Sequence, residues 1–304
     1  MSKATREVYG EVLSELAGEY KEIVVLDADL AKATKTEVFK KNYPERFFDM
    51  GIAEADMLGT AAGLAAAGKI PFASSFAVFA VGRAYDQIRN SIAYPKLNVK
   101  ICATHAGISV GEDGATHQAI EDISMVRALP NMTIINPCDE AETRWAIQEA
   151  VKIKGPVYVR LGRMKVEDVY MPDEKFDFGK GKIVREGNDI TIFATGLMVK
   201  EAVKASDILK EKAISVRVVD IHTIKPIDRE IIVRCAKETN RVITVEEHSI
   251  IGGLGSAVME VLSEEYPVKV ERIGINDCFG KSGDAVELLK EFKLTAEAIV
   301  ERIG

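Results

Sequence analysis

A glutamate at the start of an alanine-rich segment is the first residue of this sequence that could do chemistry. The stretch from Phe47 to Gly68 begins with a short apolar run, turns at Gly51, and continues in residues typical of a helix. Glu54 falls in the first turn of that expected helix. Because open α/β sheets bind ligands at the carboxyl ends of their strands, Glu54 is a candidate catalytic acid. The alternative is that Glu54 only complements the helix dipole.

A second candidate is the glycine-rich segment of residues 104–118, which we call the histidine loop. It follows a predicted strand and contains His105, Asp113 and His117. Its glycines permit close approach of the backbone to a ligand, and its polar side chains bind hydroxyl groups and transfer protons near neutral pH. Substrate contacts, a metal site and a purely structural loop remain open. The spacing of His105, Asp113 and His117 matches no recognised zinc motif, and a fourth metal ligand is not evident.

Aromatic and basic residues supply two further sets of candidates. Phe76 and Phe79 share a face if a helix begins there, either as core residues or as a shelf for a flat heterocycle. Arg6 and Arg160 lie at the two ends of the first half of the chain, and guanidinium groups suit phosphate. Taken alone, each arginine fits a solvated surface charge better.

The elements that position these residues alternate between strand and helix. Through residue 165, helical segments separate predicted strands at 23–26, 70–75, 98–103, 132–136 and 157–161. Residues 166–180 lose this periodicity and are typical of a linker. A second unit with the same alternation follows over residues 181–304. The predicted fold is therefore α/β, with two doubly wound, mostly parallel sheet domains over 1–165 and 181–304.

The composition fits two globular domains and excludes several classes of function. The chain has 304 residues, of which 47% are hydrophobic and 29% charged. A net charge of -7 argues against a broad nucleic-acid surface. The alanine-rich stretch includes Glu54 and Asp56, which argues against a membrane span there. Four widely separated cysteines and an N-terminus without an export signal lead us to expect a cytoplasmic protein.

Several motifs occur together and in the same order as in transketolases. They are Ala4-Thr-Arg6, Ala28-Asp-Leu30, Phe48-Asp-Met-Gly-Ile-Ala-Glu54, Ser75-Phe-Ala-Val-Phe79, Thr104-His105, Gly111-Glu-Asp-Gly-Ala-Thr-His-Gln118 and Phe279-Gly-Lys-Ser-Gly-Asp284. The sequence thus resembles the pyrimidine-binding and C-terminal domains of transketolase over nearly its whole length. The resemblance implies a transferase of the pentose phosphate pathway that moves a two-carbon ketol unit from a ketose phosphate to an aldose phosphate, with thiamine diphosphate as cofactor.

The resemblance also implies which residues contact the cofactor. Glu54 would hydrogen-bond the aminopyrimidine ring and favour the tautomer that removes the thiazolium proton. Phe79 would stack on the same ring, with Phe76 beside it. Asp29, in the Ala-Asp-Leu turn, would help to line the pocket.

The remaining candidates are implied to contact the sugar phosphate. His105, Asp113 and His117 would contact the sugar hydroxyls, and His117 is best placed for proton transfer. The phosphate group would be bound by three residues from separate segments: Arg6, Thr34 and Arg160. Thr34 stands near the position where the family often has a serine.

Half of the expected active site is missing from the sequence. Thiamine enzymes bind the diphosphate through magnesium with a Gly-Asp-Gly element followed by Asn, which this sequence lacks. The resemblance therefore implies a split enzyme, a heterotetramer in which a partner, the N-terminal transketolase subunit, supplies this element and binds Mg²⁺ (or Ca²⁺). This chain itself is expected to hold no metal. Gly59 and Gly63 allow close packing, either on the chain's own sheet or in self-association through the pyrimidine domain.

Three other functions remain open at this level. The beta subunit of a 2-oxoacid dehydrogenase has the same two domains, although the Gly-Glu-Asp-Gly-Ala-Thr-His-Gln segment resembles the sugar-binding form. A deoxyxylulose-phosphate synthase-like enzyme shares the Ala-Tyr-Asp-Gln of residues 84–87. A structural or regulatory subunit without catalysis is a different class, and it has no need of Glu54 together with both loop histidines.

Overall fold

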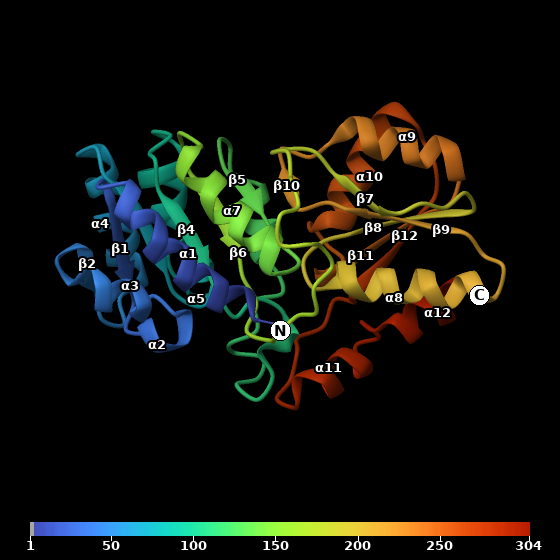
Figure 1. Ribbon diagram of the computed structural model, residues 1–304, viewed down its shortest axis with the longest axis horizontal. Coiled ribbons are helices and arrows are strands. Elements are labelled where there is room, and N and C mark those ends of the chain that lie inside the picture. Colours follow the sequence, from blue (N-terminus) through green and yellow to red (C-terminus); the bar gives the residue numbers. More distant parts are fainter. Residues whose placement is uncertain (1–2) are drawn as a thin grey trace.

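Two β-sheets, each between two layers of helices, follow one another along the chain in the computed structural model, which describes residues 3–304 (Figure 1). The first sheet has seven strands in the spatial order β10 (Thr223–Lys225), β5 (Thr133–Ile135), β6 (Val157–Arg160), β4 (Lys100–Ala103), β3 (Ile70–Ser74), β1 (Ile23–Asp27) and β2 (Phe47–Asp49). All pairs in this sheet are parallel except β10 with β5.

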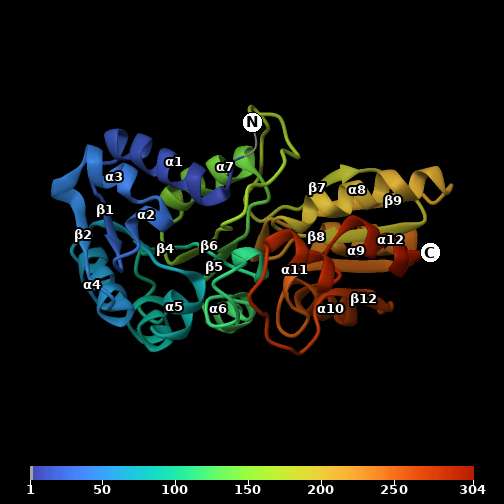
Figure 2. The ribbon, with the colours of Figure 1, turned by 90° about the horizontal axis from the view of Figure 1, so that it is seen from below.

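The helices around this sheet form two layers (Figure 2). One face packs against α1 (Thr5–Glu19), α3 (Glu37–Asn42) and α7 (Glu140–Lys152). The other face packs against α4 (Glu54–Ala66), α5 (Ala77–Gly82), the π-helical turn η2 (Gln87–Ala93) and α6 (Asp122–Arg127). Short helical turns complete the unit: α2 (Ala31–Thr34), η1 (Pro44–Arg46) and η3 (Ile108–Val110).

The central strand β1 shows why its sequence specifies this position. All five of its residues are buried, as expected for a parallel strand covered on both faces. Val24 and Leu26 belong to the core under α4 and α5. Ile23 and Val25 belong to the core under α1 and α7, because successive side chains point to opposite faces.

The second sheet has five strands in the order β12 (Val270–Ile275), β11 (Val242–Ser249), β8 (Ile190–Ala194), β9 (Val216–Asp220) and β7 (Lys182–Arg185). Only β7 is antiparallel to its neighbour. The core on one face includes residues of α8 (Met198–Glu211), α11 (Ala285–Glu291) and α12 (Ala296–Ile303). The core on the other includes residues of α9 (Arg229–Thr239) and α10 (Leu254–Glu265). The predicted fold class of two mostly parallel α/β units is confirmed.

Three local features differ from the sequence-based expectation. The strand β10, at residues 223–225, leaves the second unit and pairs with β5 of the first sheet, so the two units share a sheet edge. The sequence pattern over residues 78–92 predicts one helix, whereas the structure has a helix that is interrupted after Gly82. The pattern from Asp284 to Ile303 predicts one helical region, whereas the structure has two helices separated by a turn in which Lys293 has a φ of 57°.

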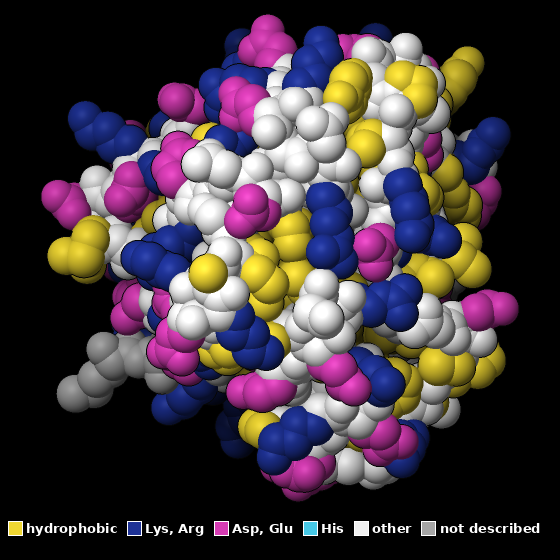
Figure 3. Space-filling view, turned by 90° about the vertical axis from the view of Figure 1, so that its right-hand side faces the viewer, with side chains coloured by type: hydrophobic (Ala, Val, Ile, Leu, Met, Phe, Trp, Pro, Cys, Tyr) yellow, Lys and Arg dark blue, Asp and Glu magenta, His cyan; other side chains and the backbone are white. Residues whose placement is uncertain are grey.

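One face of the molecule carries side chains of both charges. On the face at the right of Figure 1, basic and acidic side chains are interspersed with small apolar areas (Figure 3). Among residues 3–304, no helix is both long and apolar enough to cross a lipid bilayer.

Candidate functional site

The candidate residues are brought together at the carboxyl edge of the first sheet. Glu54 follows β2, Phe76 follows β3 and His105 follows β4. In the sheet, β2 and β3 lie on either side of β1, and β4 lies next to β3. Because parallel strands end at the same edge, residues that are far apart in sequence converge there. The structure therefore places Glu54, the aromatic pair and the histidine loop in one region.

Glu54 is a buried carboxylate that pairs with an arginine. It is the first residue of α4, and only 4% of its surface is exposed. Its Oε1 accepts a hydrogen bond of 2.9 Å from Nη1 of Arg83, which lies at the end of α5. The Arg83 guanidinium carbon also lies 4.0 Å from the centre of the Phe79 ring. One flat, hydrogen-donating group thus stacks on Phe79 and binds Glu54 at the same time.

Phe79 belongs to a group of four aromatic rings that extends into the histidine loop. Phe79 stacks with Phe76 at a centroid distance of 5.9 Å and meets the edge of His117 at 5.1 Å. Phe76 in turn stacks on His105 at 3.7 Å. The prediction that Phe76 and Phe79 share a face is confirmed by their interplanar angle of 15°. This row of rings links the environment of Glu54 to both histidines.

His105 is buried and held as a neutral imidazole. Its Nε2 lies 3.1 Å from Nη1 of Arg6, and its Nδ1 lies 2.8 Å from Oγ1 of Thr104. Because a guanidinium only donates hydrogen bonds, Nε2 must accept and the ring proton sits on Nδ1. Burial, with Arg6 and Arg163 nearby, lowers the pKa of His105 to about 3. His105 therefore carries no charge at neutral pH.

Two arginines that form no ion pair with a carboxylate among residues 3–304 line a cavity beside His105. Arg6 and Arg163 are part of the wall of a cavity of about 240 Å³, together with Gly111 of the histidine loop and Asp284 of the second unit. Burial and the charge of Arg163 lower the pKa of Arg6, and the buried Nε of Arg6 has no hydrogen-bond partner. Two neighbouring guanidinium groups are suited to bind an anion, and the carboxylates that share the cavity wall, Glu112 and Asp284, lie on exposed residues.

Arg160 does not belong to this cavity, so its predicted role in phosphate binding is wrong. Only 4% of Arg160 is exposed, and its Nε donates to Oδ2 of Asp122 at 2.8 Å. Its Nη2 donates to Asp122 Oδ1 and to the carbonyl oxygens of Ala119 and Glu247. Successive side chains of β6 point to opposite faces of the sheet, and the side chain of Arg160 points toward α6, whose first residue is Asp122. Arg160 thus joins the two units instead of facing a ligand.

Thr34 is also predicted to bind the phosphate, but its side chain is not available to a ligand. Its side chain is fully buried, and its hydroxyl donates to Oδ2 of Asp27 at 2.6 Å. Asp27 also accepts from the backbone of Leu30 and from Thr36, so it holds the turn after β1 together. Burial raises the pKa of Asp27 to about 6.

The two remaining predicted residues are exposed. Asp29 lies in the turn after β1 with a φ of 60°, a left-handed conformation that non-glycine residues adopt rarely. Asp113 lies in the outer part of the histidine loop. Both carboxylates are therefore free to meet a ligand at this edge of the sheet.

The sequence interpretation missed Arg83 and Arg163. Arg163 lies three residues beyond the end of β6, where side chains reach the ligand-binding edge, whereas Arg160 lies within the strand. Its position after a predicted strand was the available signal. Arg83 lies four residues after Phe79, a spacing that places both on one side of a helical turn.

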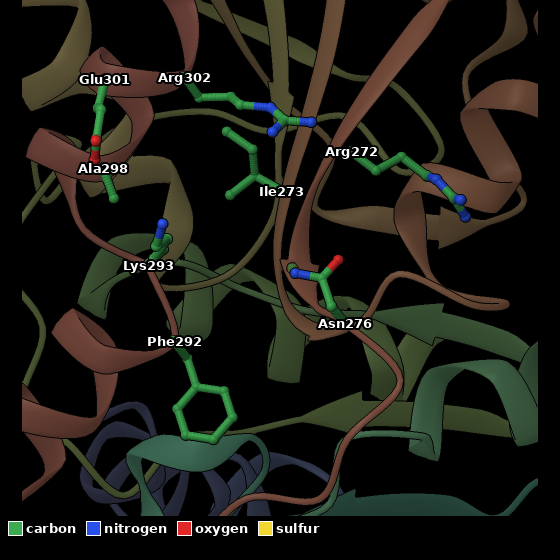
Figure 4. Close-up of a pocket in the computed structure, with 9 residues that line it drawn as sticks. Arg272, Ile273, Asn276, Phe292, Lys293, Ala298, Glu301 and Arg302 are labelled. Atoms are coloured by element: carbon green, nitrogen blue, oxygen red, sulfur yellow. The ribbon is translucent and has the colours of Figure 1, made fainter.

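Two other features of the structure lie away from this region. A cavity of about 270 Å³ lies against β12 and α12 of the second unit (Figure 4). Two of its cations are already engaged, since Arg272 donates to the Ile250 carbonyl and Arg302 pairs with Glu271. Within residues 3–304, a group with metal-ligand spacing is formed by Cys138, Glu142 and Asp220, and it does not include the loop histidines.

Comparison with known proteins identifies two family domains in the chain. The model of the transketolase pyrimidine-binding domain matches residues 1–168, and that of the transketolase C-terminal domain matches residues 179–299. A putative transketolase C-terminal section from Methanocaldococcus jannaschii is 56% identical over 99% of this chain and 95% of that protein. Rat transketolase (Rattus norvegicus) is 38% identical over 99% of this chain but only 48% of that protein. A solved structure described as a split-gene transketolase, an inactive β4 tetramer, is 53% identical, with a TM-score of 0.91 and coverage of 100% of this chain and 97% of that one.

Proposed function

This chain belongs to the transketolase family, and we propose that it forms the pyrimidine-binding half of the active site in a two-chain transketolase. The reaction would move a two-carbon ketol unit from a ketose phosphate to an aldose phosphate. The observation that carries the proposal is the pair of Glu54 and Phe79, which together hold a flat, nitrogen-bearing group. Paired arginines beside His105 support a phosphorylated substrate.

The residues at Glu54 fit the aminopyrimidine ring of thiamine diphosphate, the family's cofactor. The Arg83 guanidinium is planar, donates a hydrogen bond to Glu54 and stacks on Phe79. The aminopyrimidine ring can make the same two contacts: a ring nitrogen would share a proton with Glu54, and the ring face would stack on Phe79. When bound, the cofactor supplies stabilisation of a carbanion, which no side chain of this site provides.

The chain's own residues then have separate tasks. Glu54 holds a proton at the ring nitrogen, and its burial excludes water from that contact. His105 is buried and neutral, with Nε2 accepting from Arg6 and Nδ1 donating to Thr104, so we propose that it positions Arg6 beside the substrate. His117, next to Phe79 and in the outer half of the loop, is our proposed proton-transfer group, with Asp113 as a further contact to sugar hydroxyls.

We propose that Arg6 and Arg163 bind the phosphate of the sugar. Both guanidinium groups line the same cavity, and Arg6 also contacts His105. A phosphate there would neutralise two like charges that have no carboxylate partner of their own. Arg163 thus takes the role that the sequence assigned to Arg160.

We propose that a partner chain, the N-terminal transketolase subunit, binds the diphosphate and its Mg²⁺ (or Ca²⁺). This chain lacks the Gly-Asp-Gly element, and the similar structure is described as an inactive assembly of β chains alone. Self-association through the pyrimidine domain is supported by α4, where a Cβ atom at Gly59 or Gly63 would meet no atom within 4 Å. We propose a heterotetramer of two such pairs that works in the cytoplasm in the pentose phosphate pathway.

Reconstitution with the N-terminal subunit tests this function. The mixed chains are assayed with xylulose 5-phosphate plus ribose 5-phosphate, and separately with pyruvate. We expect ketol transfer with the sugars by the mixture alone, and native mass spectrometry should show both chains in one complex. Full turnover by this chain without a partner, or turnover of pyruvate in place of the sugars, would contradict the proposal.

A further inference from the structure

The histidine loop is held between two segments of the C-terminal unit. On one side lies the end of β11, and on the other lies the segment of residues 280–285 before α11. In Figure 1 the loop lies at the lower centre beside α11, in agreement with the contacts between η3 and α11. The part of the chain that contacts the sugar in our proposal is therefore packed against a unit that carries none of the predicted site residues.

Glu247 makes the most specific of these contacts. Its Oε1 accepts a hydrogen bond of 2.6 Å from the backbone N–H of Ser109 in η3. The carboxylate also lies directly against Gly107, where a Cβ atom would be only 2.2 Å from the Glu247 carboxyl carbon. Gly107 has a φ of 80°, so both its backbone conformation and its space require glycine. The backbone between His105 and Asp113 is thus fitted to one side chain of β11.

The opposite side of the loop is tied to residues 280–283. Ser282 Oγ donates to the carbonyl of Glu112 at 2.6 Å, next to Asp113. Gln118 Nε2 donates to the carbonyl of Lys281 at 2.9 Å, and a Cβ atom at Gly280 would overlap the Gln118 amide. These contacts fix the part of the loop that carries Asp113 and His117.

We propose that the C-terminal unit sets the geometry of the sugar-binding residues, with Glu247 as the positioning residue for the histidine loop. A carboxylate that accepts a buried backbone N–H makes a strong, directional contact, and its loss leaves the amide of Ser109 unpaired. The loop would then move relative to Phe79, which belongs to another element. Displacement of a catalytic group by about 1 Å costs on the order of 100-fold in rate.

The neighbouring Glu246 provides a matched control. It is also buried and on β11, but its carboxylate accepts from the backbone of Leu254 and Gly255 within the C-terminal unit. Burial raises the pKa of both glutamates to about 7, so they are matched in burial and in the direction of the pKa shift but hold different backbone groups. Glu246→Ala should weaken the start of α10 and leave the histidine loop in place.

Hydrogen exchange on the reconstituted complex tests the proposal directly. In Glu247→Ala, amide exchange of the peptide covering residues 107–111 should accelerate by about 10-fold or more, because the Ser109 amide loses its acceptor. Glu247→Gln, which keeps an oxygen acceptor, should restore most of the protection. Glu246→Ala should accelerate exchange at residues 254–256 only. Unchanged exchange at 107–111 in Glu247→Ala, or the same acceleration there in Glu246→Ala, would overturn the proposal.

A kinetic measurement adds a second readout, which rests on the proposed function. Glu247→Ala should lower kcat for ketol transfer by about 10- to 100-fold. Its affinity for thiamine diphosphate should stay within about 2-fold, because Glu54 and Phe79 lie on other elements. If Glu247→Ala does not fold, Ser282→Ala removes an exposed contact to the same loop and should produce a smaller change in the same direction. A fully inactive wild-type complex would refute the proposed function, whereas the exchange results would still decide the role of Glu247.

Discussion

Two arginines three residues apart, Arg160 and Arg163, should respond to mutation in opposite ways. Arg160 forms a buried ion pair with Asp122, which also accepts a hydrogen bond of 2.6 Å from Tyr158. Arg160→Ala would leave Asp122 fully buried with that one donor. Removing one partner of a buried pair costs about 3–5 kcal/mol, a large part of the stability of an average protein. We therefore expect a clearly lower urea midpoint for Arg160→Ala.

Arg163→Ala should instead keep its stability and lose substrate affinity. Arg163 is only half-buried, and its Nη1 donates to the carbonyl of Val110, a contact worth about 1 kcal/mol. A hydrogen bond from its guanidinium to a phosphate is worth about 1.5–3 kcal/mol, which corresponds to about 10- to 150-fold in KM. The loss should be confined to phosphorylated sugars, so a ketose without phosphate serves as the internal control.

The assay combines urea unfolding of the isolated chain with kinetics of the reconstituted pair. Asp122→Asn, the other half of the buried pair, should unfold as early as Arg160→Ala. Arg163→Lys should retain part of the affinity because it keeps the charge but not the planar fork. The reasoning is refuted if Arg160→Ala is as stable as wild type and specifically loses phosphorylated substrates, or if Arg163→Ala binds both kinds of sugar normally.

Three further predictions follow from the site and from the buried carboxyl groups. Glu54→Ala should fold normally but lower turnover by about 100-fold or more, because proton transfer at the cofactor ring depends on this acid; full activity in a well-folded variant would contradict its role. Arg83→Ala removes a competitor for Glu54 and Phe79, so binding of thiamine diphosphate, measured by fluorescence quenching in the complex, should tighten by about 3- to 10-fold, while weaker binding would mean that Arg83 assists the cofactor. Burial and mutual repulsion raise the pKa of Glu142, and burial raises the pKa of Asp220. Because the unfolded chain releases these protons at lower pH than the folded chain, the stability that they confer at acidic pH is lost as pH rises through the folded-state pKa values, by up to about 1.4 kcal/mol per pH unit for each proton. Urea midpoints between pH 5 and 8 should therefore decline less in Asp220→Asn than in wild type, with the exposed Asp207→Asn as control; an equal decline in both variants would show that other groups are responsible.

The sequence by itself determined the elements and most of the residues at the ligand-binding edge. Continuous apolar runs such as that of β1 are buried on both sides of a parallel sheet, which makes them recognisable without a structure. Polar residues just after such runs, including Glu54 and His105, lie at the carboxyl edge because chain direction alone places them there. The pairing of Phe76 with Phe79 follows in the same way from local spacing.

Only the tertiary structure decided which of the basic residues face a ligand and what the C-terminal unit contacts. Strand alternation puts Arg160 on one side of β6, but its role depends on Asp122 of α6 and on the Glu247 backbone, which are distant in sequence. Thr34 is removed from the site by its hydrogen bond to Asp27, a nearby residue of the same unit. The crossing of β10 into the first sheet and the contact of Glu247 with Ser109 also join distant segments. Such contacts depend on how two completed units pack together, and that packing leaves no periodic pattern in either sequence segment.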